Sequence, residues 1–249
     1  MDNTKISEYK MKDSFHNKRF EDLTDSQKRL VSHLFSSIKP EQVINCDLCN
    51  RYSKPDIYLS VGKTMKYLSL KDGRSDSMHF ESIKGIVLFL RSLGVSEKTQ
   101  KTILLFHYGD GTFNGSGKQR ILFEELLPKL APLLKEANEE LGQKKIVEAC
   151  LERFVFSGTE NRNVSADALV YGTANGLVYA TKEEIKKAVL GRHFRHIRTL
   201  HVGPMTLQPY LRDVNHRSKH PEKREIVQVK WHYLLTDIEK IESKRIIYS

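Results

Sequence analysis

Residues 55 to 71 read Pro55-Asp-Ile-Tyr-Leu-Ser-Val-Gly-Lys-Thr-Met-Lys-Tyr-Leu-Ser-Leu-Lys71. Apolar and polar side chains alternate on both sides of Gly62-Lys63, which is the pattern of two half-buried strands joined by a tight turn. The segment therefore predicts a β-hairpin. Because side chains two apart on a strand point to the same face, Ser69 and Lys71 share a face, and Asp56 enters at the same end of the pair.

The segments around the hairpin alternate between helical and strand-like patterns. Upstream, residues 23–35 start with a capping signal and have helical apolar spacing, and residues 42–46 resemble a strand. Downstream, Pro128 and Pro132 are expected to break one of the helices. The helices are expected over residues 77–93, 96–108, 119–140, 143–156, 181–190 and 234–243, and the strands near 167–172, 176–180, 200–208 and 225–232. This pattern predicts an α+β fold, a mixed sheet flanked by helices.

The composition is that of a globular protein without membrane spans. The chain has 249 residues, of which 39% are hydrophobic and 29% charged. Its longest apolar run, over residues 85–90, falls far short of the roughly 20 residues that a membrane-spanning helix needs. The first ten residues have no apolar segment, so no secretory signal is expected. Three cysteines, an odd number, favour a reducing cytoplasm over a disulfide framework.

The charge of the chain is basic and unevenly distributed. Lysine and arginine exceed aspartate and glutamate by 41 to 31, a net charge of +10. Residues 186–249 hold 14 basic and 6 acidic side chains, so +8 of this surplus lies in the last quarter of the chain. Such a surplus favours a polyanionic partner, most simply nucleic acid.

The end of the hairpin carries groups suited to phosphodiester hydrolysis. This reaction needs charge neutralisation at the phosphate and an activated water molecule. Divalent cations held by carboxylates supply both, and a lysine can orient the water. Asp56 opens the first strand and Lys71 closes the second, so the hairpin allows Asp56, Ser69 and Lys71 to converge. Glu81, ten residues after Lys71, is expected in the first turns of the helix over residues 77–93.

At these residues the chain resembles the PD-(D/E)xK nuclease superfamily, which includes many type II restriction endonucleases. The matching residues are Pro55-Asp56 and Ser69-Leu70-Lys71, and the likeness covers roughly residues 40–95. Serine stands at position 69, where the family usually has its second carboxylate. Some restriction enzymes of the superfamily have S-x-K at this place and take a glutamate from the following helix, a role that Glu81 matches here.

The resemblance implies a restriction-endonuclease-like core and a Mg²⁺-dependent endonuclease that cuts double-stranded DNA and leaves a 5′-phosphate. It implies four catalytic residues, with Asp56 and Glu81 as the metal ligands, Lys71 orienting the attacking water, and Ser69 as a neighbouring hydroxyl. His79 is expected to be a polar neighbour or phosphate contact. A sequence-specific restriction enzyme, acting as a homodimer so that two sites cut two strands, is the leading subtype. A defence nuclease without a recognition sequence is the second.

The rest of the chain is expected to hold the DNA. The sequence predicts three parts. Residues 1–20 form a loosely ordered N-terminal lead, residues 21–160 form the catalytic core, and residues 161–249 form a basic DNA-binding portion packed on the same core. Basic side chains that contact phosphates release counterions and supply much of the affinity for DNA. The candidates for such contacts are Arg74, Lys118, Arg120, Arg192, Arg195, Arg198, Arg212 and Arg217.

Three other readings stay open at this point. Gln228-Val-Lys230 is a rival to the S-x-K motif, with Asp213 as the nearest acid of interest. Cys46 and Cys49 have the spacing of zinc ligands, although their nearest partners, His193 and His196, lie far away in sequence. The glycine-rich loop over residues 109–117 lacks the residues of a phosphate-binding Walker A loop, and it is either a DNA-backbone contact that ends in Lys118 and Arg120 or a simple surface turn. The alternative function is a non-catalytic nucleic-acid-binding protein, and the choice between DNA and RNA is open.

Overall fold

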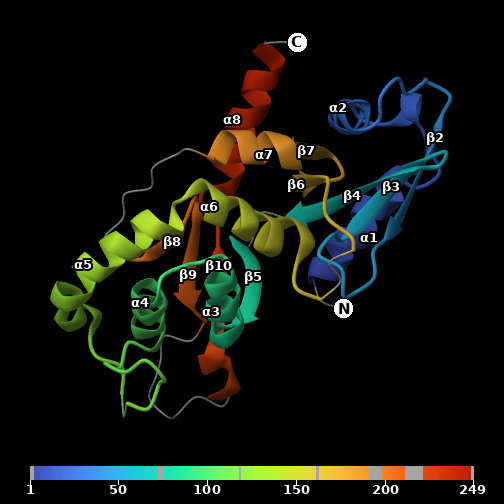
Figure 1. Ribbon diagram of the computed structural model, residues 1–249. Helices are drawn as coiled ribbons and strands as arrows, with labels where there is room; N and C mark the ends of the chain where they lie inside the picture. The colour runs from blue at the N-terminus through green and yellow to red at the C-terminus, as the bar shows by residue number, and fades with distance from the viewer. Residues whose placement is uncertain are drawn as a thin grey trace. The chain divides into compact units, whose positions relative to one another are not determined.

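The computed structural model describes residues 3–71, 76–117, 119–160, 163–190, 198–210 and 221–247. The chain divides into two compact units. Residues 1–76, 151–188 and 233–249 form the first unit, and residues 77–150 and 189–232 form the second. Each unit combines one sheet with helices (Figure 1). The α+β class that the sequence predicts is thus confirmed.

The first unit is built on a six-stranded mixed sheet in the order β1-β2-β3-β4-β6-β7. Its neighbouring strands are antiparallel, except that β4 and β6 run parallel. The strands are β1 (Lys18–Arg19), β2 (Val43–Leu48), β3 (Ile57–Val61), β4 (Thr64–Lys71), β6 (Ala168–Thr173) and β7 (Gly176–Thr181). The helices are α1 (Asn3–Phe15), α2 (Asp25–Leu34), α7 (Lys182–Val189) and α8 (Leu234–Ile247), with a 3₁₀ turn (Phe20–Asp22) and a π-helical turn (Glu152–Ser157).

The core of this unit forms between the sheet and two helices, α1, which contacts β2 and β3, and α2, which contacts β7. Ile57, Leu59 and Leu68 are fully buried against Phe15 and Leu30 from the two helices. Helix α2 begins where the capping signal predicts, because the Thr24 and Gln27 side chains and backbone N–H groups bond reciprocally.

The second unit has a four-stranded antiparallel sheet in the order β5-β10-β9-β8. Its strands are β5 (Ser77–Ser82), β8 (Leu200–Val202), β9 (Met205–Pro209) and β10 (Ile226–Lys230). Its helices are α3 (Ile83–Ser92), α4 (Glu97–Tyr108), α5 (Phe123–Leu141), α6 (Lys144–Leu151) and a 3₁₀ turn (Pro221–Glu225). Helices α3, α4 and α5 contact β5, β9 and β8, respectively.

The expectation of one helix over residues 77–93 is wrong. Residues 77–82 are strand β5, and the helix α3 begins only at Ile83, with the Ser82 hydroxyl accepting a hydrogen bond from the Gly85 N–H. Strand β5 pairs with β10, about 145 residues later in the chain. This partner supplies the backbone hydrogen bonds of a strand, and local spacing carries no sign of it.

Two further expectations differ from the structure. Residues 3–15 form helix α1 instead of a loosely ordered lead, because Met11 and Phe15 are buried in the core of the first unit. Pro128 and Pro132 lie inside one helix, α5. Its buried stripe of Leu126, Leu130 and Leu134 offsets the hydrogen bonds that the prolines cannot make.

The two units also divide the chain differently from the expected boundary near residue 160. Each unit combines segments from both sides of that boundary, because long-range strand pairing joins them. Among the helices of the described residues, none has the length and apolar character that crossing a membrane requires.

Candidate active site

The hairpin β3–β4 places Asp56 and Ser69 side by side. Ile57 pairs with Leu68, and Asp56, just before β3, donates its N–H to the same Leu68 carbonyl at 2.9 Å, one residue out of that register. The Asp56 side chain thereby comes within 3.3 Å of the Ser69 hydroxyl. The convergence of these two residues at one end of the hairpin is as the sequence predicts.

The Asp56 carboxylate is bound by donors from β4. Its Oδ2 atom accepts hydrogen bonds from the Leu70 N–H at 2.6 Å and from the Ser69 hydroxyl at 3.3 Å. Ser69 itself is 1% exposed. Both donors hold the carboxylate in one orientation at the end of the strand, as a ligand for a cation requires.

Opposing influences act on the charge of this carboxylate. Burial raises the pKa of Asp56, whereas the positive charge of Lys71, the Leu70 N–H, the positive charge of Lys54 and the Ser69 hydroxyl all act to lower it. The net shift of the pKa is upward, because burial has the largest effect. A nearby cation favours the ionised form of such a carboxylate, which suits a metal ligand.

Lys54 is the residue at this site that the sequence reasoning missed. Burial and the positive charge of Lys71 lower the pKa of Lys54, the negative charge of Asp56 acts to raise it, and the net value is about 7. The Cβ atom of Lys54 lies 3.2 Å from the position that a Cβ would occupy at Gly158 (φ +71°), so the lysine stem packs closely against that backbone. No sequence pattern marked it, because Lys54 precedes Pro55 and the start of β3.

Strand β6 fixes the other edge of β4. Ser69 pairs with Leu169 and Lys71 with Tyr171 in the parallel ladder. Before β6, the Asp167 carboxylate accepts hydrogen bonds from the Tyr67 N–H at 2.8 Å and from the Lys66 ammonium at 3.3 Å. β4 is thus held on both sides.

Glu81 lies on strand β5 and not on a helix, which corrects the expected source of this carboxylate. Its side chain is 10% exposed, and its Oε2 atom lies 3.3 Å from His79 Nε2. His79 is thus a polar neighbour of Glu81. Because Glu81 belongs to the second unit and Asp56 to the first, their meeting around one ion stays a prediction.

The Asp56 carboxylate is an oxygen ligand that suits a hard cation, one that also keeps water and substrate oxygens around it. Among the described residues, no group of three or more His, Cys, Asp or Glu side chains has the arrangement of a metal site. Magnesium needs no such cage, since it often binds one or two carboxylates together with waters and phosphate oxygens. Asp56 can supply one of these carboxylates.

The rival motif Gln228-Val-Lys230 lies on β10, away from the acids of its own sheet. Glu81 pairs with Val227 and His79 with Val229, so both acid and histidine share the face of the buried valines. Gln228 and Lys230 alternate with those valines and point to the opposite face. Asp213, the acid considered with this motif, lies outside the described residues.

Two of the expected DNA contacts lie in the described part of the chain. The Arg120 guanidinium donates to the backbone carbonyls of Phe106, His107 and Tyr108 at the end of α4. Arg198 forms an ion pair with Glu124. Both roles are structural, and DNA contact by either stays a prediction. The remaining candidates, Arg74, Lys118, Arg192, Arg195, Arg212 and Arg217, lie outside the described residues.

The glycine-rich loop is closed by its own aspartate. The Asp110 side chain, which has no exposed surface, accepts hydrogen bonds from Thr112 and Gly117. It also forms an ion pair with Arg224 at 3.0 Å. Gly109 ends α4 in the left-handed conformation with φ 61°. These bonds account for the loop without a bound phosphate.

Of the two cysteines of the C-x-x-C motif, Cys46 is buried and Cys49 is half-buried. Burial, with the nearby carboxylates, raises the pKa of both thiols to about 12. His193 and His196, the distant partners considered for zinc, lie outside the described residues.

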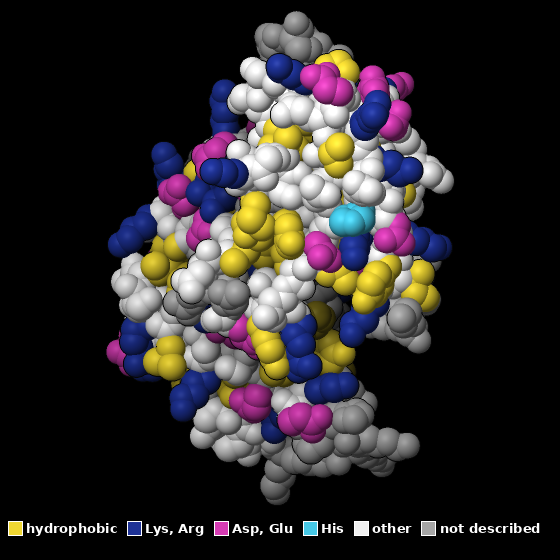
Figure 2. Space-filling model, turned by 90° about the vertical axis from the view of Figure 1, so that its right-hand side faces the viewer, with side chains coloured by type: hydrophobic (Ala, Val, Ile, Leu, Met, Phe, Trp, Pro, Cys, Tyr) yellow, Lys and Arg dark blue, Asp and Glu magenta, His cyan; other side chains and the backbone are white. Residues whose placement is uncertain are grey.

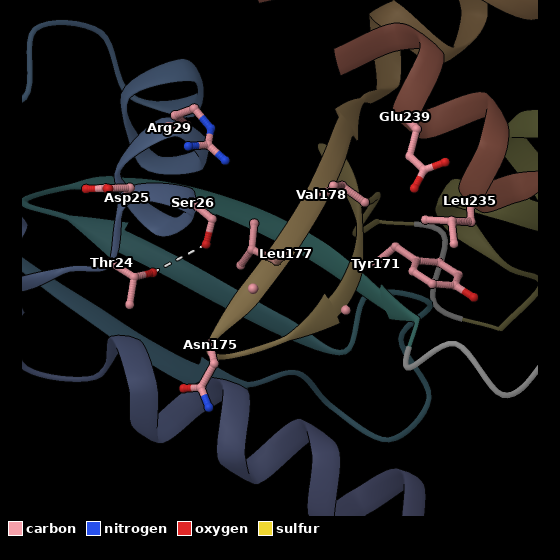
Figure 3. Close-up of a pocket in the computed structure, with 12 residues that line it drawn as sticks. Thr24, Asp25, Ser26, Arg29, Tyr171, Asn175, Leu177, Val178, Leu235 and Glu239 are labelled. Carbon is pink, nitrogen blue, oxygen red and sulfur yellow. Dashed lines mark hydrogen bonds between the residues drawn. The ribbon is translucent and has the colours of Figure 1, made fainter. Parts of the chain in front are cut away.

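A pocket of about 650 Å³ opens in the first unit between α2, the β6–β7 hairpin and α8 (Figure 3). Arg29 and Asp25 from α2 lie on one side of it, and Glu239 from α8 on the other. Tyr171, the strand partner of Lys71, also lines it. The pocket thus adjoins the strand that borders the candidate site, and its lining has charges of both signs.

A comparison with protein-family models found no match, and a comparison with curated protein sequences found none either. Among solved structures, the chain is similar to restriction endonuclease MspI in a crystal structure with its cognate DNA. The sequence identity is 10% and the TM-score 0.43, over 83% of this chain and 77% of MspI.

Proposed function

We propose that the chain is a Mg²⁺-dependent endonuclease that hydrolyses phosphodiester bonds of double-stranded DNA. The observation that carries this proposal is the Asp56 carboxylate, fixed by Ser69 and the Leu70 N–H and close enough to Lys54 and Lys71 for their charges to act on its pKa. A restrained carboxylate among ammonium groups at a strand end suits the binding of a cation and a phosphate together.

The residues have separate roles in this proposal. Asp56, with Glu81 as the second carboxylate, holds Mg²⁺, which supplies charge neutralisation at the phosphate and acidifies bound water. Lys71 orients the attacking water and Ser69 keeps the Asp56 carboxylate in position. Lys54 adds positive charge for the phosphate oxygens.

The test is cleavage of supercoiled plasmid with Mg²⁺. Asp56→Ala and Lys71→Ala are expected to lower the nicking rate by roughly 100-fold or more. Lys66→Ala is the matched control, because Lys66 lies on the same strand but pairs with Asp167. Nicking by wild-type protein that survives Asp56→Ala would contradict the proposal. Discrete fragments would mark a sequence-specific restriction enzyme, and a smear would mark a nuclease without a recognition sequence.

The alternative is a non-catalytic protein that binds nucleic acid, and the net charge of +10 favours it equally. On the face drawn in Figure 2, lysine and arginine side chains lie among acidic and hydrophobic ones. If wild-type protein binds duplex DNA but leaves it intact with Mg²⁺ and with Mn²⁺, the chain is a non-catalytic nucleic-acid-binding protein. Binding that Ca²⁺ strengthens without cleavage would instead favour the nuclease.

A further inference from the structure

The four-stranded sheet of the second unit has one buried side, and its other side is open at β5 and β10 but buried at Thr206 and His201. Val227, Val229 and Leu207 are at most 2% exposed and form the buried side. The residues that alternate with them, Gln228 on β10 and Gln208 on β9, point to the other side. The strand register places Phe80, Gln228 and Gln208 opposite one another in a single row across β5, β10 and β9.

Two aromatic rings stand on this outer side. Phe80 is 50% exposed and Tyr210, just after β9, is 38% exposed. Their ring centroids lie 5.3 Å apart in an edge-to-face arrangement. Leaving large apolar side chains in water costs free energy. Two of them together on a polar sheet face indicate a contact surface.

The charge of this face favours an anionic partner. The Lys223 ammonium lies 5.7 Å from the centre of the Tyr210 ring, and Lys230 follows two residues after Gln228 on the same face. Glu81 is the one acidic residue in β5, β9 and β10, and it points to the opposite face with Val227. The amides and lysines are half-buried, and the exposed Glu222 and Glu225 flank Lys223 outside the strands. Exposed aromatic rings beside amides and lysines are the chemistry that binds bases and phosphates.

The breadth of the face decides which form of nucleic acid fits it. The major groove of a duplex is about 12 Å wide and admits a helix or a two-stranded ribbon. The row from Phe80 to Gln208 crosses three strands spaced about 4.8 Å apart, with β8 beyond them. A sheet of this breadth does not enter the groove, whereas the unstacked bases of a single strand can lie on aromatic rings.

We infer that the outer face of the β5-β10-β9 sheet binds single-stranded nucleic acid, with bases stacked on Phe80 and Tyr210 and the backbone held by Lys223 and Lys230. This surface is separate in sequence from the hairpin residues, and its binding needs neither Asp56 nor a metal ion. The inference therefore stands or falls independently of the proposed hydrolysis.

The test is fluorescence anisotropy in EDTA with a labelled twelve-residue oligothymidylate and a duplex of the same length. Phe80→Ala and Tyr210→Ala are each expected to weaken single-strand binding about tenfold, while duplex binding changes less than about twofold. Tyr9→Ala is the matched control, since Tyr9 is 42% exposed on α1 of the first unit. Unchanged single-strand affinity, or an equal loss for both ligands, would overturn the inference.

A second measurement does not depend on the variants folding. Wild-type protein is irradiated with an oligonucleotide that contains 5-iodouracil, and the cross-linked peptides are identified by mass spectrometry. Cross-links to Phe80 or Tyr210 are expected, and cross-links confined to other segments would overturn the inference. Plasmid nicking is measured on the same variants; loss of oligonucleotide binding with intact nicking separates this surface from the catalytic proposal.

Discussion

At the residue scale, the hairpin shows which site residues the local alternation of apolar and polar side chains can place. Alternation around Gly62-Lys63 correctly placed Asp56 and Ser69 at the same end of two paired strands. Lys54 escaped notice because it precedes the strand and Pro55, where no alternation is visible. Only the tertiary structure, which buries Lys54 near the charges of Lys71 and Asp56, reveals that it belongs to this site.

The influence of neighbouring charges on the pKa of Lys54 can be measured by titration. In protein with carbon-13-methylated lysines, the Lys54 methyl signal is expected to titrate with a midpoint near 7, because burial disfavours its charged form. Lys71→Met is expected to raise this midpoint by removing a repelling charge, and Asp56→Asn to lower it by removing an attracting one. Lys66→Met is expected to leave it unchanged. A midpoint near 10.5 in wild-type protein would contradict this account.

At the element scale, strand β5 and helix α8 both depend on partners remote in sequence. β5 is a strand because β10 pairs with it. Helix α8 is attached to the first unit by Arg245, which binds both carboxylate oxygens of Glu184 at 2.8 and 2.7 Å and lies 4.1 Å from the centre of the Tyr179 ring. A bidentate, half-buried pair of this kind contributes more than an exposed ion pair does.

Replacing Arg245 is expected to destabilise the first unit in a pH-dependent manner. Burial acts to raise the pKa of Glu184, but Arg245 and the Thr181 N–H outweigh it, and the net shift is downward. A lowered folded-state pKa stabilises the protein above the unfolded value of about 4.3, and this contribution is lost as pH falls through the folded value. Arg245→Ala should therefore lower the free energy of unfolding by about 1–3 kcal/mol at pH 7.

Urea denaturation followed by circular dichroism at pH 7 and at pH 3 checks this prediction. The difference between wild-type protein and Arg245→Ala is expected to shrink from pH 7 to pH 3, because Glu184 takes up a proton as pH falls toward its lowered pKa. Lys244→Ala, on the exposed side of the same helix, is the control and should change stability by less than about 0.5 kcal/mol. An equal destabilisation by Arg245→Ala at both pH values would rule out the charge of Glu184 as its cause.

At the scale of the whole molecule, the basic surplus sets how the protein meets DNA. With about six phosphate contacts, duplex affinity is expected to fall roughly 1000-fold between 50 and 200 mM salt, because each contact releases counterions. Arg192→Ala and Arg195→Ala are each expected to reduce the slope of log affinity against log salt by about 1.

Anisotropy measured across a salt series tests this, with Lys10→Ala on α1 as the control. A slope that neither arginine variant changes would remove the segment over residues 192–198 from the DNA contacts.

The sequence by itself determined the hairpin, its polar end, the α+β class and the basic character, because alternation, turn residues and charge are properties of neighbouring residues. Tertiary structure decided that residues 77–82 pair with residues 226–230 as a strand, that Lys54 joins Asp56, and that segments distant in the chain form each unit. The physical reason is the same in each case. Backbone hydrogen bonds between strands and the removal of side chains from water depend on partners that a local window of sequence does not contain.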